Sequence, residues 1–394
     1  MELKLLDRIL LKALYLVVAG IVVCEVLDIQ ITSTLFLFTF PLTVALWIRT
    51  VRQKVTGLDF AALTAIVLAF INVLINASIT NTDIDFDYLK KVIMFSMSLL
   101  FLQTCYRIRV KKDMVVFINR LVDCLTILLI VAFFLWNSQM HMIDNRVSAY
   151  LTFRFSNPNL TGLFLVCLYM LELYRLFSRE KWGWKLLHIA MAAFLGYFIL
   201  ESQSRNSLLA FVAFTAVCAW LIFKSRRQLR ITKVGATVFS IAPAVFVMFY
   251  MAMVNLPWVQ IILDFLVGEG KALTSRHDVW ETALTALYSS PLIGAYSQIS
   301  NGEGALQMHN SHLDIAASYG IVVFLLVCYL LWRYLYQKGR YYNHKSNYVY
   351  ILGFVCAILL GIGEAALFSG GLGIYVFIGT FLMLANYEKQ ESIG

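Results

Sequence analysis

Long apolar runs, each close to the length that crosses the hydrocarbon core of a bilayer, recur from one end of this chain to the other. A helix needs about 20 apolar residues to span such a core. A water-soluble fold has no way to bury so many apolar residues, which fill 60% of the 394 positions. The pattern predicts an all-α polytopic membrane protein with about 12 transmembrane helices, near residues 9–29, 32–49, 58–77, 91–106, 114–136, 159–177, 186–201, 207–223, 234–254, 313–332, 348–368 and 371–387.

Lys and Arg gather in every second loop of this predicted helix pattern. Cytoplasmic loops of membrane proteins retain positive charge, whereas translocated loops carry little of it. The alternation therefore places both termini in the cytoplasm. The net charge of +9 then reflects topology and contact with anionic membrane lipids, and no nucleic-acid partner is expected. The basic clusters lie at residues 4–12, 49–54, 107–112, 175–185, 224–233 and 333–345.

One long polar stretch, residues 255–311, interrupts the apolar pattern on the side opposite the termini. Ser275 is a suitable cap for a helix inside it, which would end at Ser290 and Pro291. The apolar face of that helix would comprise Val279, Trp280, Ala283, Leu284 and Leu287. We expect a single integral membrane domain over residues 1–394, with an extracytoplasmic loop subdomain at 255–311 that contains short helices.

Few Lys and Arg remain on the outer side, where each is costly for a membrane protein. Arg205 lies in the turn Glu201–Ser207, which is too short to form a free loop, so we expect its side chain in a cavity at the outer membrane face. The alternative is an arginine that reaches lipid headgroups or pairs with Glu201. Arg276 falls in the first turn of the helix that Ser275 caps, where backbone N–H groups and a guanidinium both favour an anion. The alternative there is a solvated arginine at a helix start.

His309 precedes Asn310 and Ser311, which can cap the helix of the next span. The positive end of that helix favours a neutral imidazole, which can accept a proton from a hydroxyl. The alternative is a histidine that only satisfies local hydrogen bonds, and His312 is a second candidate in the first helical turn. The spacing of His309, His312 and Asp314 would suit a metal, but no convincing fourth ligand follows, so no metal site is expected.

Four short motifs stand in a fixed order along the chain. They are RFSNPNLTG at 154–162, SQSRNSLLA at 202–210, SRHDVW at 275–280 followed by SPLIG at 290–294, and HNSHLD at 309–314 with Gly320 downstream. Over about residues 150–330 the chain resembles the O-antigen ligase and polysaccharide (O-antigen) polymerase superfamily of membrane glycosyltransferases. The hydropathy of the remaining sequence agrees with that resemblance.

The resemblance implies a metal-independent, inverting glycosyltransferase of the GT-C-like class, working without a cofactor on the outer face of the plasma (inner) membrane. Its donor would be a glycan on undecaprenyl diphosphate. By analogy, Arg205 and Arg276 hold the diphosphate leaving group in place of a divalent ion, and His309 positions or deprotonates the acceptor hydroxyl. Three acidic residues that could be considered for a metal instead suggest a solvated loop, namely Asp83, Asp85 and Asp87.

Further residues are candidates for substrate contact. Arg154, Asn157 and Asn159 are expected to line the same cavity, although the Asn-Pro-Asn sequence is equally typical of a turn that caps a helix. Glu364 lies among glycines near the outer end of a predicted span. It would pair with an active-site arginine or contact sugar hydroxyls, and an interhelical hydrogen bond without functional meaning is the alternative.

The acceptor separates two functions within the superfamily. A polymerase moves a growing chain onto a lipid-linked repeat unit, whereas a ligase moves a finished chain onto lipid A–core or another terminal acceptor. The Phe-Ser-Asn-Pro-Asn stretch favours a polymerase, which would act with a flippase and a chain-length regulator. A flippase or transporter of lipid-linked sugars is the alternative from another class. It is disfavoured because transporters place ionisable groups at mid-membrane, whereas these groups cluster at one face.

Overall fold

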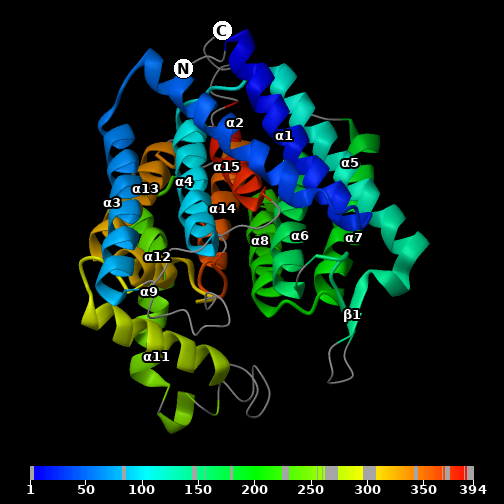
Figure 1. Ribbon diagram of the computed structural model, residues 1–394. Helices are drawn as coiled ribbons and strands as arrows, with labels where there is room; N and C mark the ends of the chain where they lie inside the picture. The colour runs from blue at the N-terminus through cyan, green and yellow to red at the C-terminus, as the bar shows by residue number, and fades with distance from the viewer. Residues whose placement is uncertain are drawn as a thin grey trace.

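The protein is described by a computed structural model as a bundle of helices with one small antiparallel hairpin (Figure 1). The structure describes residues 4–81, 86–143, 149–155, 157–177, 181–223, 230–254, 256–259, 261, 274–295, 308–340, 345–365, 367–368, 373–385 and 387. The first nine helices are α1 (Leu5–Val26), α2 (Thr32–Gln53), α3 (Gly57–Thr80), α4 (Phe86–Arg107), α5 (Lys112–Trp136), α6 (Pro158–Leu173), α7 (Trp182–Glu201), α8 (Arg205–Phe223) and α9 (Lys233–Met253). They are followed by α11 (Thr274–Ser289), α12 (Ser311–Tyr319), α13 (Ile321–Lys338), α14 (Lys345–Leu360) and α15 (Ile374–Leu384). Short 3-10 turns cover Asn137–Gln139 and Tyr174–Phe177, and the hairpin pairs β1 (His141–Ile143) with β2 (Ala149–Leu151).

Nine helices in the described ranges are long and apolar enough to cross a membrane. They are α1, α2, α3, α5, α6, α7, α8, α9 and α13, with α5 and α6 each extended by the short turn that follows. Two shorter apolar helices, Asn347–Leu360 and Ile374–Leu384, lie near the C-terminus. The expected all-helical, polytopic membrane fold is therefore confirmed, while the number of 12 crossings stays a prediction.

The predicted span 313–332 is wrong as a single helix, because the chain breaks at Gly320 between α12 and α13. Gly320 has a φ of 87°, and a Cβ atom there would lie 2.1 Å from the carbonyl oxygen of Leu292. Only glycine allows this backbone conformation and this approach together. Asn72 on α3 secures the junction, since its Nδ2 donates to the carbonyl oxygen of Tyr319 at 2.6 Å. The break fixes the direction of α12, whose N-terminal end follows His309.

Helix α11 lies at the end of the bundle opposite the start of α1 (Figure 1). The apolar face that the sequence predicts packs on α9, where Trp280 and Ala283 are buried in one cluster with Tyr250. The indole Nε1 of Trp280 also donates to the carbonyl oxygen of Met308 at 2.8 Å. Because Arg276 lies one turn before Trp280 and His309 directly follows Met308, this packing brings the arginine and the histidine to the same place.

Candidate functional site

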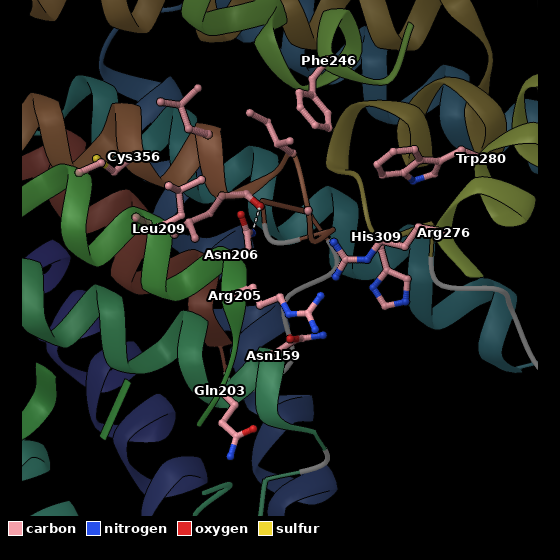
Figure 2. A pocket seen from close by; sticks show the side chains of 16 residues that line it. Asn159, Gln203, Arg205, Asn206, Leu209, Phe246, Arg276, Trp280, His309 and Cys356 are labelled. Carbon is pink, nitrogen blue, oxygen red and sulfur yellow. Dashed lines mark hydrogen bonds between the residues drawn. The ribbon is translucent and has the colours of Figure 1, made fainter. Parts of the chain in front are cut away.

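A cavity of 810 Å³ opens where α8, α9, α11 and α14 approach one another (Figure 2). Its polar wall gathers side chains from four separate segments of the chain, namely Asn159, Gln203, Arg205, Asn206, Arg276 and His309. Its apolar wall is formed by Leu209, Ala210, Ala213, Phe246, Trp280, Cys356, Leu359, Leu360 and Ile362. The cavity therefore offers a cationic mouth that continues into an apolar groove.

Arg205 begins α8 and points into this cavity (Figure 2). The tight turn before it contains Gln203, whose φ is 51°. Among the described residues, no hydrogen bond or ion pair is made by the guanidinium of Arg205, and Glu201 is not its partner. Leu209 and Ala213 follow one and two turns along the same face of α8, so the charge stands at the head of an apolar stripe. The cavity placement expected for Arg205 is what the structure shows.

Arg276 lies in the first turn of α11, as the sequence predicts. Its Nη2 is 3.1 Å from Oε1 of Glu364, and the two side chains are 25% and 13% exposed. Gly363 makes this approach feasible, since a Cβ atom there would lie 3.2 Å from Nη1 of Arg276 and 3.0 Å from Cγ of Asn206. Arg276 thus has an acidic partner and still faces the cavity, whereas Arg205 has no acidic partner in the part of the chain that the structure describes.

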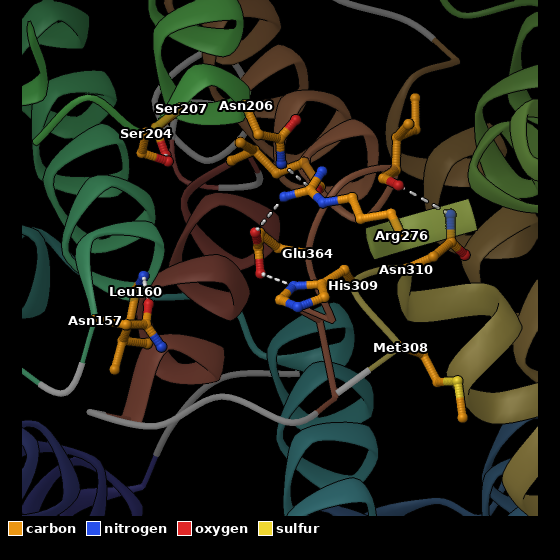
Figure 3. Close-up of polar contacts among 12 residues, drawn as sticks. Asn157, Leu160, Ser204, Asn206, Ser207, Arg276, Met308, His309, Asn310 and Glu364 are labelled. Carbon is orange, nitrogen blue, oxygen red and sulfur yellow. Dashed lines mark hydrogen bonds and ion pairs between the residues drawn. The ribbon is translucent and has the colours of Figure 1, made fainter. Parts of the chain in front are cut away.

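His309 is the second partner of Glu364 (Figure 3). The Nδ1 atom of His309 lies 3.2 Å from Oε2 of Glu364, and the imidazole is 30% exposed. In the tautomer that this contact favours, Nδ1–H donates to the carboxylate and Nε2 keeps a free lone pair. Such an imidazole can accept a proton from a hydroxyl in the cavity. Glu364 therefore contacts both an arginine and a histidine. The contact with the arginine is one of the pairings that the sequence suggested.

Asn310 holds the histidine in place through both ends of its side-chain amide. Its Oδ1 caps α12 by accepting from the backbone N–H groups of His312 and Leu313, at 3.1 and 2.9 Å. Its Nδ2 donates to the carbonyl oxygens of Pro243 on α9 and Ile362 after α14, at 2.9 and 3.0 Å. The predicted cap is confirmed, and the same residue links three segments of the site.

Ser311 holds the segment that carries Glu364. Its Oγ donates to the backbone carbonyl oxygen of Glu364 at 3.0 Å, and its backbone N–H donates to that of Gly361 at 2.9 Å. Backbone hydrogen bonds therefore support the contact between His309 and Glu364. They hold the backbone from which the Glu364 side chain projects before any substrate binds.

His312 occupies a different environment three residues further on. Its side chain is fully buried, and Nε2 donates to the carbonyl oxygen of Ser240 on α9 at 2.7 Å. Asp314 instead pairs with Lys91 on α4 at 2.7 Å. The metal ligands considered from the spacing of His309, His312 and Asp314 therefore point to separate partners. His312 does not line the cavity.

Of the three candidates near α6, only Asn159 lines the cavity. Asn157 caps α6, because its Oδ1 accepts from the backbone N–H of Leu160 at 2.7 Å. Arg154 hydrogen-bonds Gln139 and lies 3.9 Å from Asp28. The structure thus gives Asn157 the capping role that the Asn-Pro-Asn sequence also suggested, and it gives Arg154 contacts away from the cavity.

The small residues of two motifs serve helix packing. A Cβ atom on Gly162 of α6 would lie 2.6 Å from Cβ of Ser204 and from Oγ of Ser207. Ser204 and Ser207 in turn share a hydrogen bond of 2.9 Å between their hydroxyl groups. These residues let α6 and α8 meet closely, which sets the position from which Arg205 projects.

Gln203 and Asn206 line the cavity although the sequence reasoning did not single them out. The Nδ2 of Asn206 donates to the carbonyl oxygen of Leu360 at 2.7 Å, which ties the start of α8 to the end of α14. Their closeness to Arg205 in the sequence was the one feature that could have pointed to these two residues.

One group in the described ranges has the geometry to hold a metal ion, with ligand atoms of Asp123, Glu172 and His188 within 4.8 Å of one another. Arg175 already occupies this group, since its Nη1 lies 2.7 Å from Oδ1 of Asp123. A guanidinium therefore supplies the positive charge that an ion would bring, and the group lies at the other end of α6 from the cavity.

Several predictions fall outside the described residues. They concern Asp83 and Asp85, the side chain of Asp87, and much of the loop subdomain at 255–311, of which the structure describes 256–259, 261, 274–295 and 308–311. The boundaries of that subdomain stay a prediction.

Comparison with protein families adds independent evidence. Residues 189–328 match a family model described as O-antigen ligase. Over this stretch the chain is similar to the O-antigen ligase family. It begins in α7, ends in α13 and contains Arg205, Arg276 and His309, so the resemblance seen in the motifs is confirmed. Glu364 lies beyond the matched stretch. A search of curated proteins returned no match.

Proposed function

We propose that this protein is a metal-independent, inverting glycosyltransferase of the GT-C class. It transfers a glycan from undecaprenyl diphosphate to a hydroxyl of a lipid-linked repeat unit, and so polymerises a surface polysaccharide on the outer face of the plasma membrane. The observation that carries this proposal is the meeting of Arg205, Arg276 and His309 in one cavity, together with the similarity of residues 189–328 to the O-antigen ligase family.

The two halves of the cavity suit the two halves of such a donor. Guanidinium groups bind phosphate oxygens through paired, charge-assisted hydrogen bonds. Arg205 and Arg276 lie at the mouth, where a diphosphate would be accessible from the aqueous side. The apolar wall along α8 and α14, including Leu209 and Leu359, offers a surface for a prenyl chain. A free nucleotide sugar would leave that apolar wall without a partner.

The transfer reaction assigns a step to each group. The acceptor oxygen forms a bond with the anomeric carbon, while the bond from that carbon to the diphosphate oxygen breaks. The electron pair of the broken bond leaves with the diphosphate, whose growing negative charge Arg205 and Arg276 stabilise. The proton of the acceptor hydroxyl passes to Nε2 of His309. Attack opposite the leaving group inverts the anomeric centre.

The acceptor decides between polymerase and ligase. Incubation of the purified protein with lipid-linked repeat units alone should give a ladder of longer lipid-linked glycans, because a polymerase uses the same molecule as donor and acceptor. Transfer only after addition of lipid A–core would instead assign the ligase reaction. The experiment includes the ligase reaction because the matching family model is described as O-antigen ligase.

The proposal also requires the cavity to face outward. Reporter fusions should place Gln228 in the cytoplasm and positions next to Arg205, Arg276 and His309 outside, because the basic loops alternate along the sequence. Access to Arg276 from the cytoplasm alone would rule out a donor site on the outer face.

A further inference from the structure

The carboxylate of Glu364 divides its two oxygens between two groups of the proposed site (Figure 3). Oε1 lies 3.1 Å from Nη2 of Arg276, and Oε2 lies 3.2 Å from Nδ1 of His309. The side chain is only 13% exposed, so water screens these contacts weakly. Its backbone is held by Ser311, which leaves the carboxylate as the part able to change partners.

Because its carboxylate is shared with Arg276, Glu364 stabilises a protonated His309 less than an unshared carboxylate would. A full carboxylate charge beside Nδ1–H stabilises the imidazolium that forms when Nε2 takes a proton, and it also fixes the ring. Part of that charge is compensated while Arg276 is in contact with Oε1. His309 is therefore a weaker proton acceptor while the arginine and the histidine share one carboxylate.

A diphosphate at the cavity mouth competes with Glu364 for Arg276. Both are anions, and like charges on one guanidinium repel each other in a site of low solvent access. Among the described residues, the charged and titratable groups near His309 are Glu364, Arg276 from α11 and Arg205 from α8, while His277 lies 3.8 Å from Glu281. Displacement from Arg276 leaves His309 as the partner of Glu364.

We propose that Glu364 is a positioning residue that changes partners: it pairs with Arg276 and His309 in the empty cavity, and with His309 alone once the donor diphosphate holds Arg276. Acceptor activation then follows donor binding. This inference rests on the proposed function, because it takes the lipid diphosphate as the ligand of Arg276.

The test compares Glu364→Gln with the wild-type protein, both full length in nanodiscs, using undecaprenyl diphosphate for binding and lipid-linked repeat units for turnover. The amide lacks the charge that competes for Arg276, so undecaprenyl diphosphate should bind about 2- to 5-fold more tightly. Turnover should fall about 10- to 100-fold, since the neutral amide stabilises the imidazolium less. The acidic limb of the pH–rate profile should move to lower pH for the same reason.

Two further variants isolate the partner change. In an Arg276→Ala background, Glu364→Gln should no longer tighten binding, because the contested guanidinium is gone. Glu281→Gln, which removes an exposed carboxylate on the outer face of α11, should leave binding and turnover unchanged. Should Glu364→Gln fold poorly, Glu364→Asp serves, since its shorter side chain cannot hold both partners. It should turn over more slowly than wild type without weaker donor binding.

Weaker binding of undecaprenyl diphosphate to Glu364→Gln or Glu364→Asp, or unchanged turnover, would overturn the partner change and leave the proposed function standing. A wild-type protein that does not bind undecaprenyl diphosphate would overturn both.

Discussion

The protein contains two clusters built from the same three residue types, at opposite ends of α6. At the cavity, Glu364 contacts Arg276 and His309, with side chains that are 13%, 25% and 30% exposed. At the other end, Glu172 lies 3.0 Å from His188, with exposures of 0% and 4%. The first cluster is open to a ligand and the second is closed.

The closed cluster pairs most of its charged groups internally, although Oε1 of Glu172 is buried without a hydrogen-bond partner. Arg175 contacts Asp123 at 2.7 Å and donates to the carbonyl oxygen of Asn119 at 2.6 Å. Residue type alone therefore does not indicate a site. A place on the wall of a cavity, which Arg276 and His309 share, distinguishes the candidate reactive cluster from the structural one.

The largest expected effect comes from removing one histidine from each cluster. His309→Ala should lower surface polysaccharide synthesis about 10²- to 10⁴-fold at unchanged protein abundance, because it removes the proton acceptor. His188→Ala should lower abundance while each remaining molecule stays active. Complementation of a deletion strain, with protein amount measured by immunoblot, checks both variants. The comparison fails if His188→Ala abolishes synthesis at normal abundance.

Substitution of the cavity arginines should give the second-largest effect. Arg205→Ala and Arg276→Ala should each reduce glycan transfer about 10²- to 10³-fold, as for loss of a group that stabilises a leaving-group charge. Lysine at either position should restore only part of the activity, because an ammonium cannot reproduce the paired hydrogen bonds of the guanidinium. Initial rates with lipid-linked repeat units provide the measurement. Full activity of both alanine variants would make these arginines structural.

A substitution of Arg175 tests whether the closed cluster serves stability alone. Arg175→Ala should destabilise the protein by about 3–5 kcal/mol, because it leaves the buried Glu172 and the partly buried Asp123 without their cation. Thermal unfolding in detergent should show a lower midpoint, whereas the affinity for undecaprenyl diphosphate should remain that of the wild type. A selective loss of donor binding with normal stability would assign the closed cluster a part in substrate recognition.

His312→Ala should have the smallest effect on transfer. The residue donates to the carbonyl oxygen of Ser240 and does not line the cavity, so its loss should reduce stability by about 1–3 kcal/mol and change the rate per molecule only slightly. Parallel assays of His309→Ala and His312→Ala at matched amounts measure the contrast. Equal losses in both variants would contradict the assignment of the proton acceptor to His309.

The sequence predicted which cations and which histidine meet, for a physical reason. Charges on the translocated side of a membrane protein are few, so Arg205 and Arg276 were among the cations that stood out once the basic loops were assigned. His309 was selected by its place before a helix start, and the family motifs supported all three residues. The predicted apolar face that includes Trp280 and Ala283 is buried in the structure.

Other features depend on contacts between distant segments. The break at Gly320 arises from the carbonyl oxygen of Leu292, so hydropathy alone predicted one continuous helix. Glu364 could be assigned several partners, because nothing in its neighbourhood shows that Ser311 holds its backbone. The closed cluster was missed because Asp123, Glu172 and His188 lie on three helices, α5, α6 and α7, and meet only when these helices pack.

Release of undecaprenyl diphosphate by the purified wild-type protein tests the role of the open cluster most directly. With lipid-linked repeat units and excess EDTA, free undecaprenyl diphosphate should appear in step with glycan transfer, because two arginines take the place of a divalent ion. Transfer that requires added metal, or repeat units that remain intact under conditions where the protein is folded, would contradict this mechanism.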